Sequence, residues 1–124
     1  MNVVDSSAWL EYFAGGPNAS FFAAAIEDQK RLIIPSICIY EVFKTILRQL
    51  GKKEALEKTA AMRQGKVVDL TTALALQAAS ISLKHRLAMA DSIVLATARA
   101  NHGVLWTQDS DFEALQSVKF RAKR

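Results

Sequence analysis

The sequence predicts an α/β fold in which a short, mostly parallel sheet lies between two layers of helices. Short runs rich in valine and isoleucine alternate with longer segments whose apolar residues recur at helical spacing. Parallel neighbouring strands need helical crossovers and are buried on both faces, so short apolar strands separated by helices indicate such a sheet. We expect about four or five strands and about seven helices in a three-layer α/β/α arrangement.

Serine, glycine and proline residues divide the first half of the chain. Ser6 or Ser7 can cap a helix after the first strand, and the Gly-Gly-Pro sequence at 15–17 ends this helix. Pro35 stops the second strand, and Gly51 ends the long amphipathic helix that follows. The expected elements are strands at 2–4 and 32–34 and helices at about 6–14, 18–29, 36–50 and 53–64.

Threonine, glycine and serine residues mark the elements of the second half. Thr71 or Thr72 can cap an alanine-rich helix, Gly103 ends the next helix, and Ser110 can cap a final helical turn. The expected elements are strands at 67–68 and 104–107, an edge strand at 118–120, helices at about 71–85 and 91–101, and a turn of helix from Ser110.

The length and composition predict a single globular domain spanning residues 1–124, with 51% hydrophobic and 23% charged residues. Charged residues interrupt every apolar stretch before it reaches the roughly 18 residues that a membrane helix needs, and no signal-peptide pattern opens the chain. Cys38 is the only cysteine and lies in an apolar run, where a small buried side chain is expected. We therefore expect a cytoplasmic protein without membrane association.

The chain is basic, with 16 Lys and Arg against 12 Asp and Glu and a net charge of +4. If four acidic residues surround a metal, eight remain against the 16 basic residues, so the rest of the molecule carries about +8. A basic exterior around an acidic pocket suits a polyanionic substrate, although a solvated surface explains any single basic cluster equally well. The clusters are Lys52-Lys53, Lys84-His85-Arg86 and the tail residues Lys119, Arg121, Lys123 and Arg124.

Four carboxylates lie at or near the ends of predicted elements: Asp5, Glu41, Asp91 and Asp109. Asp5 and Asp109 directly follow strands, and functional groups of open α/β sheets gather beyond the carboxyl ends of strands. Carboxylates brought together raise one another's pKa values unless a positive charge lies among them. A hard divalent cation with oxygen ligands meets this requirement.

Each acidic residue also has a structural interpretation. Asp5 can be a helix N-cap, and Asp91 suits the positive N-terminal end of its helix. Asp111 is either a secondary metal ligand or a first-turn residue of the last helix. Glu41 has apolar neighbours at helical spacing, so it is expected to point inward and to need a cation or metal as its partner.

Four segments together resemble the PIN domain, and most closely the VapC-type toxins of bacterial and archaeal toxin–antitoxin pairs. The resemblance covers essentially the whole chain. The segment at 107–112 and Met89-Ala90-Asp91 are its most specific parts, and Ser6 stands where this family more often has threonine. The four segments are Asp5-Ser6-Ser7, Glu41 in its helix, residues 88–98, and Thr107-Gln108-Asp109-Ser110-Asp111-Phe112.

The resemblance implies a PIN-like fold and an endoribonuclease that depends on Mg²⁺ or Mn²⁺. It also implies a homodimer, a cognate antitoxin that holds the enzyme inactive, and an RNA substrate such as tRNA or rRNA. Hydrolysis at a metal-bound water would leave a 5′ phosphate and a 3′ hydroxyl. By matching position, the metal-binding carboxylates are Asp5, Glu41, Asp91 and Asp109, with Asp111 as an additional acid and Ser6, Ser7 and Thr107 as polar site neighbours.

Two other functions compete with this interpretation. A non-catalytic PIN-like module could bind RNA or protein without turnover. A phosphoacceptor domain could use Asp69 after the third strand, but the first strand lacks the paired acids that such a domain needs for Mg²⁺. Metal titration and a search for aspartyl phosphate distinguish these functions from the nuclease.

Overall fold

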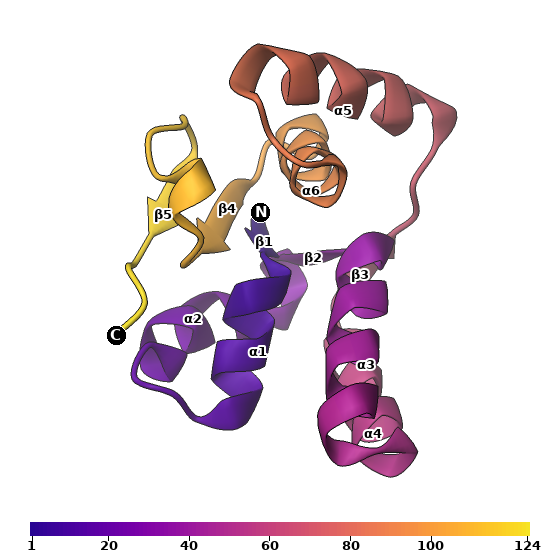
Figure 1. Ribbon diagram of the computed structural model, residues 1–124, viewed down its shortest axis with the longest axis vertical. Helices are drawn as coiled ribbons and strands as arrows, with labels where there is room; N and C mark the ends of the chain where they lie inside the picture. Colours follow the sequence, from indigo (N-terminus) through magenta and orange to yellow (C-terminus); the bar gives the residue numbers. More distant parts are fainter.

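A computed structural model describes residues 1–124, in which five strands and six α-helices alternate along the chain (Figure 1). The α/β prediction is confirmed. The strands are β1 (Asn2–Val4), β2 (Leu32–Pro35), β3 (Lys66–Val68), β4 (Val104–Thr107) and β5 (Val118–Phe120). The helices are α1 (Ser6–Ala14), α2 (Ala19–Ile26), α3 (Ser36–Leu50), α4 (Lys52–Met62), α5 (Thr72–His85) and α6 (Met89–Ala100), with 3₁₀ turns η1 (Gln29–Arg31) and η2 (Ser110–Phe112).

The expected helical turn from Ser110 is a 3₁₀ turn, so the chain has six α-helices where about seven helices were expected. In η2 the amide of Phe112 donates to the carbonyl of Asp109 at 3.1 Å, and the amide of Glu113 donates to that of Ser110 at 3.1 Å. Both are i to i+3 bonds, which close a 3₁₀ turn instead of an α-helix. Few residues separate this turn from β5, so the chain has no room for a longer helix.

All five strands are parallel and lie in the order β3-β2-β1-β4-β5. The chain therefore builds the sheet outward from β1 through β2 to β3, and then returns to the other side of β1 for β4. This reversal leaves a topological switch point between the carboxyl ends of β1 and β4, which is where open α/β sheets place their sites. In the register of these two strands, Val4 is opposite Trp106.

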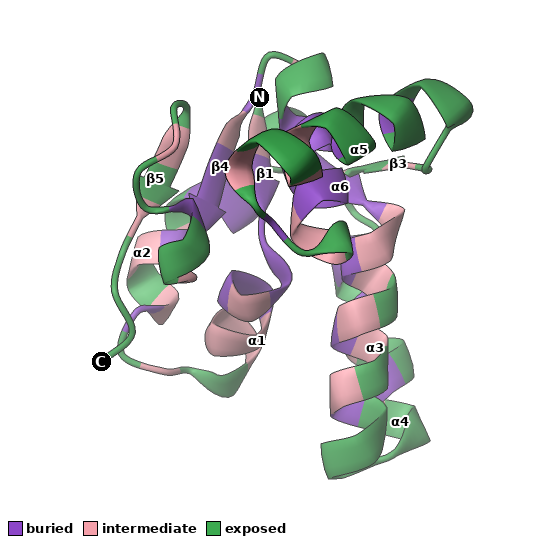
Figure 2. Ribbon diagram, turned by 45° about the horizontal axis from the view of Figure 1, so that its top comes forward, coloured by how far each residue is buried: buried purple, intermediate pink, exposed green.

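The helices form three hairpins, α1 with α2, α3 with α4, and α5 with α6. In Figure 1 the α5–α6 hairpin lies above the sheet and the α1–α2 hairpin lies below it, while α3 and α4 project away from the sheet. Figure 2 shows that α6 is largely buried between the sheet and α5, whereas much of α4 and α5 is exposed. None of the helices is both long and apolar enough to cross a membrane.

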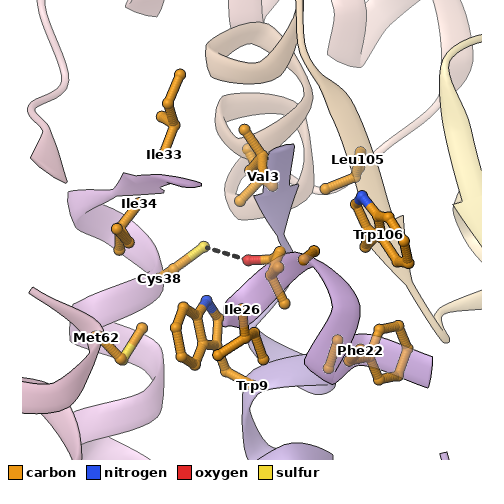
Figure 3. Packing of buried hydrophobic residues seen from close by; sticks show 14 of the residues in the cluster. Val3, Trp9, Phe22, Ile26, Ile33, Ile34, Cys38, Met62, Leu105 and Trp106 are labelled. Atoms are coloured by element: carbon orange, nitrogen blue, oxygen red, sulfur yellow. Dashed lines mark hydrogen bonds between the residues drawn. The ribbon is translucent and has the colours of Figure 1, made fainter. Parts of the chain in front are cut away.

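The core is a cluster of 22 buried residues that joins the sheet to α1, α2, α3, α4 and α6. Trp9 and Phe22 are among its largest fully buried side chains, and Figure 3 shows them packed below β1. Cys38 is fully buried, its thiol lies 3.9 Å from the carbonyl oxygen of Val4, and burial raises the pKa of the thiol well above its usual range. It is therefore a small apolar side chain of the core.

Helix α6 begins at Met89, two residues before the expected start at Asp91. Ala88 has an extended backbone and occupies the N-cap position, and the hydroxyl of Ser92 donates to the carbonyl of Ala88 at 2.8 Å. Asp91 consequently lies in the first turn of the helix. The first turn of a helix has unpaired backbone N–H groups, which favour negative charge nearby.

Candidate metal centre

Asp5 directly follows β1 and is held by three hydrogen bonds. Its Oδ1 accepts from the backbone amide of Ser6 at 2.8 Å, and its Oδ2 accepts from the hydroxyls of Ser7 and Thr107, both at 2.9 Å. The side chain is the N-cap of α1, as its structural interpretation predicted. A carboxylate has about four lone-pair positions, so one position stays open for a further partner.

Burial is the largest influence on Asp5, which is only 4% exposed. Burial raises the pKa of this carboxyl, and the charge of Asp109 raises it further, while the hydrogen bonds from Thr107 and Ser7 lower it. The net direction is upward. Asp5 can thus be both an N-cap and a member of the acidic centre, because different lone pairs of its carboxylate oxygens are used in the two roles.

Thr107 connects the carboxyl ends of β1 and β4. Its hydroxyl donates to Asp5 Oδ2 and accepts from the backbone amide of Asp109 at 2.9 Å. Thr107 is fully buried, so this hydroxyl has no water to replace either partner. The segment from Asp109 to Asp111 is held by a similar bond, since the backbone amide of Asp111 donates to Asp109 Oδ1 at 2.9 Å.

Glu41 lies on α3 and is half-buried. The hydroxyl of Ser6, the first residue of α1, donates to Glu41 Oε1 at 2.7 Å. A short hydrogen bond to a charged acceptor is stronger than one between neutral groups, and it holds the glutamate toward the carboxyl end of β1. The expected inward direction is found, and a neutral hydroxyl is one partner of the carboxylate.

Asp91 shows how strongly the acidic residues interact. Burial is the largest cause that raises its pKa to about 7, and the charges of Asp5, Asp109, Glu41 and Asp111 add to it in that order. The other four acidic residues selected from the sequence therefore all act electrostatically on Asp91. The five residues come from the ends of β1 and β4, from α3 and from α6, which are far apart in the chain.

Asp91, Asp109 and Asp111 form the tightest group. One carboxylate oxygen from each of them lies within 4.8 Å of the others, which is a suitable spacing for ligands of one ion. Asp111 is exposed, and Asp5 and Glu41 lie outside this group of three. The five acidic residues are therefore not all equally close to one another. Asp69, the acceptor of the competing phosphotransfer function, is exposed at the end of β3 and also lies outside the group.

No basic side chain neutralises this centre. The single ion pair of the chain joins Arg31 to Asp28 on the surface. Hydroxyl and amide groups satisfy part of the carboxylate oxygens, but they supply no positive charge. A set of oxygen donors with uncompensated negative charge fits a hard divalent cation such as Mg²⁺ or Mn²⁺.

Two residues beside the centre were not selected from the sequence. Gln108 is 7% exposed, and its side-chain carbonyl accepts from Asn18 Nδ2 at 3.1 Å. Asn18 is 1% exposed, and the same nitrogen donates to the carbonyl of Ala122 at 2.9 Å. Gln108 could have been selected from the sequence, because it lies between two site residues, Thr107 and Asp109. Asn18 could not, because an asparagine after Gly-Gly-Pro is ordinary in a loop.

Solved structures with this fold include three from toxin–antitoxin systems. A toxin–antitoxin complex from Klebsiella pneumoniae has a TM-score of 0.84 and 18% identity, with 100% of both chains covered. VapC20 from Mycobacterium tuberculosis, a toxin that cleaves the sarcin-ricin loop, has a TM-score of 0.77 and 21% identity over 94% of this chain and 95% of that one. DNA-bound VapBC from Salmonella typhimurium has a TM-score of 0.75 and 15% identity over 98% and 96%.

At these identities the structural likeness establishes the fold. No curated protein sequence is significantly similar to this chain. The sequence model of the PIN domain, in contrast, matches residues 3–117, which include all five acidic residues of the centre. The chain therefore belongs to the PIN domain family.

Proposed function

We propose that the chain is a VapC-type endoribonuclease toxin that hydrolyses RNA phosphodiester bonds with a divalent cation. The observation that carries this proposal is Asp91 with four further carboxylates that raise its pKa and no basic partner, at the switch point between β1 and β4. Such a group is electrostatically costly in the free protein and becomes favourable when a cation binds.

Asp5, Glu41, Asp91 and Asp109 are the proposed metal-binding and catalytic residues, with Asp111 as a secondary ligand. A bound Mg²⁺ or Mn²⁺ would lower the pKa of a water molecule and stabilise the leaving 3′ oxygen, which yields 5′-phosphate and 3′-hydroxyl products. The polar neighbours hold these carboxylates. Ser7 and Thr107 orient Asp5, and Ser6 orients Glu41. Each of these two carboxylates keeps at least one lone pair free for a cation.

The partners of the protein are part of the proposal. The similar structures from Klebsiella pneumoniae and Salmonella typhimurium belong to a toxin–antitoxin complex and to VapBC, which supports a cognate antitoxin as the inhibitor of this chain. The substrate would be a structured RNA such as tRNA or rRNA, the working form a homodimer, and the compartment the cytoplasm. Copurification from the native host with sequencing of RNA ends would identify the antitoxin and the target.

Cleavage assays with purified protein test the catalytic proposal. We expect RNA cleavage with Mg²⁺ or Mn²⁺, none with a chelator, and a loss of at least about 100-fold for Asp91→Asn, because an essential charged ligand is removed. Asp69→Asn is the matched control, since it removes an exposed carboxylate outside the centre and should leave the rate unchanged. Metal-independent cleavage would overturn the proposal.

The non-catalytic binding module makes the opposite prediction for metal. Calorimetric titration with Mn²⁺ should show binding to the wild type and to Asp69→Asn, and weak or no binding to Asp91→Asn. Absence of Mn²⁺ binding to the wild type would favour the binding module.

A further inference from the structure

A hollow of about 440 Å³ opens beside the acidic centre. Residues of α1 and α3 form its apolar part, and the C-terminal residues Lys123 and Arg124 line it together with Lys58 of α4. In Figure 1 the chain end lies next to the α1–α2 hairpin. The hollow therefore combines an apolar floor with basic side chains from two distant parts of the chain.

Three residues join this hollow to the acidic centre. Ser7 lines the hollow, and its hydroxyl is bonded to Asp5 Oδ2. Gln108 lines it and directly precedes Asp109. Thr45 lines it from α3, where it lies one turn beyond Glu41 on the same helix face. The hollow and the acidic centre are therefore adjacent.

The charge of the hollow is opposite to that of the centre. Among its lining side chains, Lys58, Lys123 and Arg124 contribute three positive charges, and Glu11 contributes one negative charge. The carboxylate of Glu11 is already hydrogen-bonded within the protein, since its Oε2 accepts from the backbone amide of Asn18 at 2.8 Å. The hollow thus presents a net excess of positive charge next to a group of carboxylates.

The C-terminal segment is fastened in place at three points. The backbone amide of Arg121 donates to the carbonyl of Thr107 at 3.0 Å, and the Arg121 guanidinium lies 4.3 Å from the ring centroid of Phe21. The buried Asn18 bonds the carbonyl of Ala122 and the side chain of Gln108 with one nitrogen. These contacts direct the two residues that follow toward the hollow instead of leaving them to the solvent.

We propose that this hollow binds the phosphate backbone of single-stranded RNA next to the scissile bond, with Lys123, Arg124 and Lys58 as its phosphate-binding residues. The inference rests on the proposed function, and it assigns Asn18 as the positioning residue of the basic segment. Lysine and arginine contacts to phosphate supply affinity and register without reading sequence. The acidic centre repels RNA, so an adjacent basic surface must supply the attraction that brings the scissile phosphate to it.

The test uses the double variant Lys123→Gln/Arg124→Gln of the full chain. Its matched control is Lys30→Gln/Lys66→Gln, which removes the same charge from two exposed residues at the amino ends of β2 and β3, on the opposite edge of the parallel sheet. The probe is a short fluorescein-labelled single-stranded RNA, and its affinity is measured by anisotropy over a range of KCl concentrations in an Asp91→Asn background.

We expect the tail variant to bind RNA about tenfold more weakly at 0.1 M salt. The slope of log affinity against log salt concentration should be smaller by about 1.4, because two phosphate contacts to a single strand are lost. In the active protein, KM should rise by a similar factor while the single-turnover rate at saturating RNA stays unchanged. Asn18→Ala should reproduce part of the loss in affinity with the basic residues intact, and a melting curve establishes that it is folded.

Four results would overturn the inference. Equal losses in the tail variant and its control would show a general effect of net charge. Unchanged RNA binding together with weaker binding of poly-L-glutamate would show that the hollow takes an acidic protein segment. If the wild type cleaves RNA and the tail variant has an unchanged KM, this inference fails alone. If the wild type neither binds nor cleaves RNA, the proposed function fails with it.

Discussion

At the scale of single residues, the pKa of Asp91 is raised from 3.8 to about 7 by burial and by four neighbouring carboxylates. Between pH 3.8 and about pH 7, Asp91 is consequently protonated in the folded state and ionised in the unfolded state. Where the folded state binds more protons, the free energy of unfolding falls as pH rises. The metal-free centre thus destabilises the fold at neutral pH, and Asp5 acts in the same direction because its pKa is also raised.

We therefore predict that the metal-free protein becomes less stable as pH rises from about 4 to about 7. Asp91→Asn should flatten this dependence and raise the Tm at about pH 8 by roughly 4 °C. This corresponds to about 1 kcal/mol in a domain of this size, a value reduced for solvent screening of a half-exposed group. Thermal unfolding in a chelator at several pH values measures both effects.

Asp69→Asn is again the control for this measurement. Asp69 is exposed at the end of β3 and lies outside the acidic group, so its replacement should leave the pH dependence unchanged. A lower Tm for Asp91→Asn at about pH 8 in the chelator would contradict the electrostatic account. It would indicate that the carboxylate stabilises the N-terminal end of α6 by more than the neighbouring carboxylates destabilise it.

At the scale of helices and strands, one short hydrogen bond links α1 to α3. The hydroxyl of Ser6 at the start of α1 donates to Glu41 Oε1, and the same residue's amide donates to Asp5. Ser6 is 7% exposed, so water does not easily replace this hydroxyl. The bond therefore links the start of α1 to α3 and orients the side chain of Glu41.

We predict that Ser6→Ala lowers the free energy of unfolding by about 1.5–3 kcal/mol, the usual contribution of a hydrogen bond to a charged group. Metal affinity should also fall, because Glu41 loses its orientation. Ser6→Thr is the matched control, since it keeps the hydroxyl and restores the residue more common in this family. Urea unfolding and Mn²⁺ titration provide the measurements. Equal losses for both substitutions would attribute the effect to packing instead of the hydrogen bond.

Local signals predicted most elements because helix and strand ends depend on neighbours in sequence. Thr71 caps α5 by accepting from the amide of Leu74 at 3.2 Å, as its position before an alanine-rich run indicated. Gly51 ends α3 as expected. The start of α6 was predicted two residues too late, since Ala88 is a poor cap by composition. The helical turn from Ser110 is present, and its 3₁₀ geometry, which the sequence did not specify, follows from the short distance to β5.

At the scale of the whole molecule, the acidic centre joins parts that the chain supplies separately. Asp5 follows β1, Glu41 comes from α3, Asp91 from α6, and Asp109 follows β4. A cation bound by these residues would connect the α1–α2 hairpin, the α3–α4 hairpin and the α5–α6 hairpin. Binding should then stabilise the molecule as a unit instead of one loop.

We predict that saturating Mg²⁺ or Mn²⁺ raises the global free energy of unfolding, by about 2.7 kcal/mol at a metal concentration of 100 times Kd. Amide hydrogen exchange should slow in β1, α3 and α6 together, and a chelator should reverse the effect. Asp5→Asn should lose the metal-dependent part. Protection confined to α6 and residues 107–112 would indicate that Asp91, Asp109 and Asp111 alone bind the ion and that Glu41 does not participate.

The sequence by itself determined the order of the elements, the apolar character of the strands and the placement of acidic residues at their ends. These features depend on backbone preferences and hydrophobic periodicity, which act between residues close in the chain. Only the tertiary structure decided which acids meet, that Thr107 satisfies Asp5 from 102 residues away, and that Asn18 fastens Ala122 beside the centre. Those contacts depend on strand order and on helix packing across the sheet, so no local pattern encodes them.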